Sequence, residues 1–302
     1  MSFLDNAIVA TLPMFPNFLT KRVAGRYIAG SSLADAISTA KLMMEQGNCA
    51  TLDILGENVQ RKEESREAVS AYKRVLSAIQ HEKLDANISI KPTHLGLRID
   101  KDFCLQNIDE LVSIAKKMNN FVRIDMEDRT TTTDTLAMYQ QLREKHGSIG
   151  VAIQAYLKRS KKDVQSLASE NANFRLCKGI YIEPPEVAYQ EMSKINENFM
   201  TLLEIMLGAG SYVGIATHDD YLVAKSEKLI DKLGLATKDY EFQMLLGVKE
   251  KNRQEVVAKG HKMRVYVPFG KDWFPYSLRR LKENPRLVRH IMRELLKWER
   301  FP

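Results

Sequence analysis

The chain contains few cysteines, no uninterrupted apolar run and no basic leader. Its 302 residues include only Cys49, Cys104 and Cys177, which lack the paired spacing of a disulfide framework or a CxxC metal site. The most apolar window, residues 199–217, is interrupted by Glu204 and a Gly-Ala-Gly sequence, which favours a helix followed by a strand over a membrane span. No basic region precedes the first apolar residues, so no signal peptide is predicted. We expect a cytoplasmic protein without a transmembrane segment.

Concentrated charge of one sign is also missing. The 45 Lys and Arg residues exceed the 38 Asp and Glu residues by seven, and both kinds are dispersed along the chain. Dispersed charge is typical of a solvated surface, so no nucleic-acid partner is predicted. A weak attraction to the anionic inner face of the cell membrane is compatible with the same charge. The length allows one large domain or two of average size.

Short β-rich runs alternate with longer amphipathic stretches. Helical spacing of apolar residues is clear in residues 63–80, 104–118 and 219–234. The β-rich runs are residues 50–57, 87–96, 121–128, 150–156, 174–181, 212–219, 241–248 and 263–270. This alternation predicts a (β/α)8 TIM-type barrel over residues 46–302, with a helical segment over residues 1–45 packed on it.

A doubly wound sheet is the competing fold, and it needs a glycine-rich turn after its first strand. The candidate turn "GAGSYVG", residues 208–214, precedes its strand instead of following it. We therefore interpret this segment as a helix end and a loop. The barrel remains the predicted fold.

Polar residues stand at or near the ends of the predicted strands, where barrel enzymes place their chemistry. Any one of them has a structural explanation: Lys91 can be a surface lysine, and Gln154 a core amide. Together they predict a pocket, because barrel interiors are otherwise filled by branched apolar side chains. They are Lys91, Asp125, Glu127, Asp128, Gln154, Arg175, Lys178, Tyr181, Thr217, His218, Asp219, Gln243 and Tyr266.

Three classes of function fit such a pocket. Asp125, Glu127 and His218 are metal-ligating types, as in a metal-dependent barrel hydrolase or lyase, although no HxH pair is present. Arg175 and Lys178 favour an anionic ligand over a divalent cation. A non-catalytic protein that binds an anion is the third class.

Five segments resemble the proline dehydrogenase family, in its short, single-function bacterial form. They are "FVRIDMED", "FRLCKGIYIEP", "IATHDD", "FQMLLGV" and "VYVPFGKDWFPYSLRRLKENP", in this order over most of the chain. The resemblance implies FAD as cofactor and oxidation of L-proline to Δ1-pyrroline-5-carboxylate, the first step of proline catabolism. It also implies hydride transfer to flavin N5 and a quinone as electron acceptor, at the membrane surface.

The same resemblance implies a role for individual residues, and no metal. Asp125 and Arg175 are the implied catalytic residues, with Arg175 facing the flavin N5 edge. The implied substrate-binding residues are Lys91, Tyr266, Tyr276, Arg279, Arg280 and Glu283, with the two adjacent arginines binding the substrate carboxylate. The implied cofactor-binding residues are Met126, Gln154, Arg175, Lys178, Gly179, Ile180, Tyr181, Thr217 and His218.

Three positions refine this interpretation. Ile180 stands where a smaller residue is common in the family. Cys177 lies beside the flavin-facing segment, and a small buried hydrophobic role is expected for it. The phenol of Tyr276 would leave little room for a 4-hydroxyl group, which predicts a preference for proline over trans-4-hydroxyproline.

Overall fold

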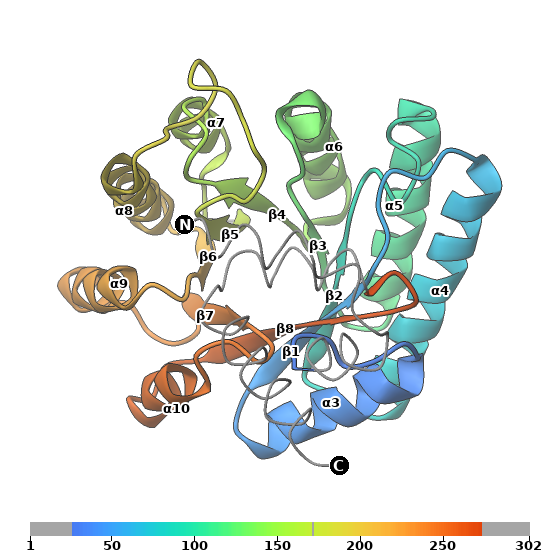
Figure 1. The fold of residues 1–302 in the computed structure, drawn as a ribbon, viewed down its shortest axis with the longest axis horizontal. Coiled ribbons are helices and arrows are strands. Elements are labelled where there is room, and N and C mark those ends of the chain that lie inside the picture. The colour runs from blue at the N-terminus through green and yellow to red at the C-terminus, as the bar shows by residue number, and fades with distance from the viewer. Residues whose placement is uncertain (1–25, 171, 274–302) are drawn as a thin grey trace, which may run out of the picture.

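The computed structural model describes residues 26–170 and 172–273. In these residues eight parallel strands close a barrel in sequence order, and helices surround it (Figure 1). The strands are β1 Cys49–Ile54, β2 Ala86–Ile90, β3 Val122–Ile124, β4 Ile149–Gln154, β5 Asn173–Cys177, β6 Tyr212–Ala216, β7 Tyr240–Leu245 and β8 Met263–Phe269. The helices are α3 Leu33–Glu45, α4 Lys62–His81, α5 Lys101–Lys117, α6 Arg129–His146, α7 Ser160–Leu167, α8 Met192–Gly208, α9 Asp220–Leu233 and α10 Glu250–Ala258. The predicted (β/α)8 barrel is confirmed.

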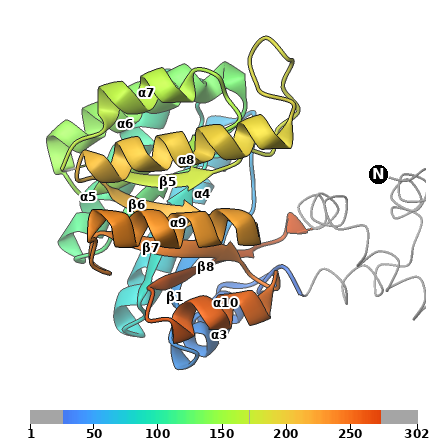
Figure 2. The ribbon, with the colours of Figure 1, turned by 90° about the vertical axis from the view of Figure 1, so that its left-hand side faces the viewer.

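The strands are buried on both faces, as parallel strands covered by helices must be. Strands β2 and β4 are buried over their whole length. The helices supply the outer layer through one apolar stripe each; α4, for example, buries Val69, Tyr72, Leu76 and Ile79. The main core therefore lies between the strands and the surrounding helices, which Figure 2 shows from the side.

Three aspartates begin the helices that follow strands. Asp100, Asp128 and Asp219 are the N-caps of α5, α6 and α9, and each carboxylate accepts a hydrogen bond from a backbone N–H in the first turn. Such caps fix the exit angle of the loop and satisfy amides that the helix leaves unpaired. Asp128 and Asp219 therefore stabilise the starts of α6 and α9, at the strand ends where the sequence analysis predicted polar residues.

Helix α3 precedes β1 in the chain but packs against both β1 and β8. It therefore covers the closing seam of the barrel, as Figure 1 shows below these two strands. A capping box between Ser32 and Asp35 begins the helix. Residues 1–25 of the predicted N-terminal segment lie outside the described residues.

In the part of the chain that the structure describes, no helix has both the length and the apolar character needed to cross a bilayer.

Candidate active site

The C-terminal ends of the strands surround a cavity of about 380 Å³, a size common for small-molecule sites. It is lined by every residue within the described part of the chain that the family resemblance assigned to the catalytic, substrate-binding or cofactor-binding set: Lys91, Asp125, Met126, Gln154, Arg175, Lys178, Gly179, Ile180, Tyr181, Thr217, His218 and Tyr266. The other predicted substrate residues, Tyr276, Arg279, Arg280 and Glu283, lie outside the described residues. One cavity thus brings together residues from strands β2 to β8.

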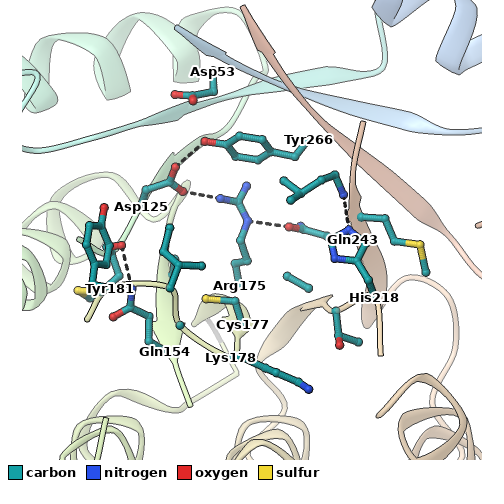
Figure 3. A pocket seen from close by; sticks show the side chains of 18 of the residues that line it. Asp53, Asp125, Gln154, Arg175, Cys177, Lys178, Tyr181, His218, Gln243 and Tyr266 are labelled. Atoms are coloured by element: carbon teal, nitrogen blue, oxygen red, sulfur yellow. Dashed lines mark hydrogen bonds and ion pairs between the residues drawn. The ribbon is translucent and has the colours of Figure 1, made fainter. Parts of the chain in front are cut away.

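Arg175 of β5 is the centre of the polar contacts in this cavity (Figure 3). Its Nε donates to Oε1 of Gln243 at 2.6 Å, and its Nη1 donates to Oγ of Ser89 at 3.1 Å and to Oδ1 of Asp125. The guanidinium carbon lies 5.1 Å from the centre of the Tyr266 ring. These contacts come from β2, β7, β8 and the residue that follows β3, so side chains from four sides of the barrel fix Arg175.

Asp125 is also held from several sides. Its Oδ1 accepts a hydrogen bond from Ser89 at 2.7 Å, and its Oδ2 accepts one from the Tyr266 hydroxyl at 2.8 Å. Burial, reinforced by the Asp125 charge, raises the pKa of Tyr266 well above its usual value, so the phenol remains a donor. Arg123, the neighbour in sequence, does not pair with Asp125 and binds Asn173 instead.

Lys91 forms an ion pair with Asp53 of β1, at 2.8 Å to both carboxylate oxygens. The Asp53 side chain is 1% exposed and that of Lys91 11%. Burial alone would lower the pKa of Lys91, but the carboxylates of Asp53 and Asp125 outweigh it, and the pKa is raised. Lys91 therefore remains an ammonium group inside the cavity at neutral pH.

The opposite wall carries the residues predicted to contact a cofactor. Lys178 forms an ion pair with Asp219 at 2.6 Å. Nε2 of His218 accepts a hydrogen bond from the backbone N–H of Leu245 at 2.8 Å, so a neutral His218 carries its proton on Nδ1. Contacts within the protein thus hold the side chains of Lys178 and His218 in place without a ligand.

Two buried polar atoms that belong to cavity-lining residues have no hydrogen-bond partner within the described residues. Oε1 of Gln154 is an open acceptor, although its Nε2 donates to the Met126 carbonyl at 3.2 Å. Nη2 of Arg175 is an open donor. Because buried polar atoms are nearly always paired, these two point to a ligand with both an N–H donor and an acceptor.

The side chains named for a metal site form hydrogen bonds with other protein groups. Glu127 is bonded to the backbone N–H and the hydroxyl of Thr93, and burial raises its pKa to about 6. Asp125 and His218 have the partners given above. Over residues 26–170 and 172–273 no group of three His, Cys, Asp or Glu side chains could hold a metal ion.

Some members of the site had no assigned role in the sequence analysis. Asp53 lies within the predicted first strand and not at its end, and Ser89 is a small hydroxyl in an apolar run. The alternation of side chains along a strand was the signal available for Asp53, since it puts Asp53 on the same face as Thr51 and opposite Leu52.

Cys177 lines the cavity, and burial raises the pKa of its thiol to about 11, which keeps it protonated. Asp128 does not line the cavity.

The fold and the site define a (β/α)8-barrel protein with a binding cavity at its C-terminal mouth, in which the polar side chains are arranged around a fixed arginine. The family model described as proline dehydrogenase matches residues 36–291. The chain therefore belongs to the proline dehydrogenase family, and the resemblance seen in the sequence is confirmed.

Several relatives match over nearly their whole length, as the short single-function form requires. Proline dehydrogenase 1 of Bacillus subtilis (strain 168) is 34% identical over 92% of this chain and 92% of its own. Proline dehydrogenase 2 of the same strain is 35% identical over 94% of each chain. Proline dehydrogenase of Deinococcus radiodurans is 31% identical over 91% of this chain and 90% of its own.

Two solved structures that share the barrel belong to longer proteins. Proline utilization A from Bdellovibrio bacteriovorus, inactivated by N-propargylglycine, has a TM-score of 0.82 and 25% identity, over 87% of this chain and 32% of its own. Proline utilization A from Corynebacterium freiburgense has a TM-score of 0.76 and 21% identity, over 97% of this chain and 35% of its own. This chain thus spans about a third of those proteins, and the second likeness shows the fold alone.

Proposed function

We propose that the protein is a FAD-dependent dehydrogenase that oxidises L-proline to Δ1-pyrroline-5-carboxylate and passes the electrons to a quinone. The observation that carries the proposal is the position of Arg175, fixed by Asp125, Ser89 and Gln243 at the centre of the cavity with one donor left open. The family membership supplies the reaction class.

The donor set of the cavity fits a flavin. The flavin ring carries an N–H between two carbonyl oxygens and an unprotonated N5, so it offers a donor for Gln154 Oε1 and an acceptor for Arg175 Nη2. At Gly179 the backbone has φ 107°, which favours glycine, and the carbonyl of the preceding Lys178 accepts a hydrogen bond from the Tyr156 N–H. Met126, Ile180, Tyr181, Thr217 and His218 complete the proposed cofactor wall.

The substrate side of the proposed site contains two ion pairs, Lys91 with Asp53 and Arg175 with Asp125. The Lys91 ammonium attracts the proline carboxylate, and the Tyr266 ring forms a wall for the pyrrolidine ring. We further propose that Arg279 and Arg280 bind the carboxylate, with Glu283 holding one of them and Tyr276 covering the ring. Two guanidinium groups suit a carboxylate because each can donate two parallel hydrogen bonds.

When bound, FAD supplies the two-electron acceptor for a hydride from the ring carbon next to the proline nitrogen. The protein has to provide orientation and charge. The positive charge of Arg175, held in place before reaction, stabilises negative charge as it develops on the ring system. The proline nitrogen must also lose a proton. Lys91 and Tyr266 are both protonated at neutral pH, so the proton passes to a base other than these two.

An anaerobic absorbance spectrum of the purified protein, recorded before and after addition of L-proline, tests the proposal. We expect a flavin band near ~450 nm that bleaches with proline, because the reduced ring absorbs weakly there. Addition of a water-soluble quinone should then restore the band. The exposed apolar side chains of Ile180, which lines the cavity, and of Met192, which contacts the cavity residue Lys178, support a lipophilic acceptor.

Three other outcomes would contradict parts of the proposal. A band that proline does not bleach would retain the cofactor and reject the substrate. A bleached band that quinone does not restore would reject the acceptor. No band after addition of FAD would reject the cofactor, and a metal analysis would then be the next measurement.

Replacement of Tyr276 by serine is expected to relax the preference for proline over trans-4-hydroxyproline by about 10-fold, because the smaller side chain leaves room for the hydroxyl group. The ratio of kcat/KM values for the two substrates measures the change. Tyr221→Ser, on the exposed start of α9, is the control and should leave the ratio unchanged. Equal ratios in wild type and Tyr276→Ser would show that this phenol does not set the preference.

A further inference from the structure

A chain of buried polar contacts continues from Arg175 away from the cavity. Gln243 of β7, which faces Arg175 in Figure 3, donates through Nε2 to Oε1 of Glu241 at 2.6 Å. The same oxygen accepts a hydrogen bond from Nε of Arg264 at 2.7 Å. Arg264 in turn donates to the carbonyl of Ala50 at 2.8 Å. Gln243 lines the cavity, whereas Glu241 and Arg264 do not.

The two ends of this chain determine how the Gln243 amide is oriented. An ionised carboxylate accepts hydrogen bonds only, and a guanidinium donates only. Gln243 therefore has to turn its NH2 group towards Glu241 and its oxygen towards Nε of Arg175. If residue 241 could also donate, the amide could rotate by half a turn and present its NH2 group to Arg175, which would repel it.

Glu241 is ionised throughout the working pH range. Burial opposes its charge, but Arg264 outweighs burial, and the pKa of Glu241 is lowered to about 2. Arg123 and Arg175 lie in the same barrel interior, and burial and the Arg175 charge lower the pKa of Arg123 to about 9. The Glu241 carboxylate is thus a fixed negative charge among buried arginines.

The neighbouring strand leaves space for this arrangement. A Cβ atom at Gly214 of β6 would lie 2.3 Å from Nε2 of Gln243. The glycine therefore admits the amide group in the position that joins Glu241 to Arg175. The contact is part of the barrel packing and does not depend on a ligand.

We propose that Glu241 is a positioning residue for the reaction: through Gln243 it fixes the guanidinium of Arg175 in the geometry that the redox step requires. Glu241 does not touch the substrate or the cofactor. The inference rests on the proposed function for its kinetic readout, and a second readout is independent of that function.

A double-mutant cycle tests whether Glu241 acts through Gln243. Glu241→Gln and Gln243→Leu are each expected to lower the rate of flavin reduction by L-proline by about 10- to 100-fold, the effect of a lost hydrogen bond to a charged group. The double variant should be no slower than Gln243→Leu alone. If Glu241→Gln lowers the rate by the same factor in both backgrounds, or in neither, the proposal is wrong.

Glu241→Gln leaves Arg264 without its charged partner and can prevent folding. In that case Glu241→Gln/Arg264→Gln, which removes both buried charges, takes its place in the cycle with the same expected result. Asn107→Leu is the matched control. It removes a buried hydrogen bond of 2.9 Å to the Leu95 carbonyl, outside the cavity and outside the contacts of Glu241 and Arg264. Its rate should equal that of the wild type.

The second readout is the Nε–H resonance of Arg175 in protein labelled with 15N-arginine, identified by its absence in Arg175→Lys. We expect Glu241→Gln to shift or broaden this resonance and Asn107→Leu to leave it in place. An unchanged resonance in Glu241→Gln would overturn the proposal even if this variant reduces the flavin more slowly than the wild type. If proline does not reduce the wild type, the proposed function fails, and this resonance alone decides the role of Glu241.

Discussion

Replacement of Arg175 by methionine is expected to lower the rate of flavin reduction by L-proline by about 10²- to 10³-fold, the effect of removing a charge stabiliser from an active site. The side chain is 8% exposed and joins Asp125, Ser89 and Gln243 across the barrel. Arg175→Lys keeps the charge but cannot reach both Asp125 and Gln243, so we expect it to be nearly as slow. Anaerobic stopped-flow absorbance measures these rates.

Arg98→Met is the control for this prediction. Arg98 pairs with Asp128 at 2.6 Å on the surface, outside the cavity, and its loss should leave the rate unchanged. A rate for Arg175→Met within about threefold of the wild type would contradict an electrostatic role for Arg175. A thermal unfolding curve for each variant separates loss of the fold from loss of the reaction.

Replacement of Asp53 by asparagine is expected to lower the free energy of unfolding by about 3–5 kcal/mol. Lys91 would keep its buried ammonium group but lose the carboxylate that contacts it at 2.8 Å. Asp53→Asn/Lys91→Met, which removes both charges, should recover part of the loss, because a buried pair replaced as a whole costs little. Urea unfolding at neutral pH measures all three proteins.

Lys41 and Glu82 provide the matched surface pair. They lie 2.5 Å apart with side chains 49% and 30% exposed, so Glu82→Gln should change the free energy of unfolding by no more than about 1 kcal/mol. Equal losses for Asp53→Asn and Glu82→Gln would mean that burial does not strengthen the Lys91–Asp53 pair. A stable Asp53→Asn with lost substrate binding would instead assign Asp53 to the site alone.

The barrel and most of the cavity could be predicted because both depend on local signals. Each strand is an apolar run of a few residues, and each helix shows spacings of three and four. The polar residues near the strand ends, such as Gln154, Lys178 and His218, then meet because parallel strands in a closed barrel end at one mouth. The barrel topology alone therefore predicts that these residues lie close together.

The partners of those residues could not be predicted, because they depend on which side chains meet across the barrel interior. The Asp125 carboxylate contacts Arg175, fifty positions away, and no local feature of the sequence indicates this pair. Glu241 stands at the beginning of its predicted run and not at its end, so nothing local distinguished it from a surface glutamate. Its link to Arg264 follows from strands β7 and β8 lying side by side.

Helix α3 contacts both the first and the last strand of the barrel. Its packing can therefore be completed only late in synthesis. Translation delivers α3 and β1 first and β8 last among the described elements. β1 pairs with β8 along its whole length. One edge of β1 therefore stays without a hydrogen-bonding partner until β8 has left the ribosome. Helix α3 likewise lacks half of its packing surface until then. Bare strand edges invite pairing with other chains. The nascent protein therefore exposes an unpaired strand edge until almost all of the described elements have been made.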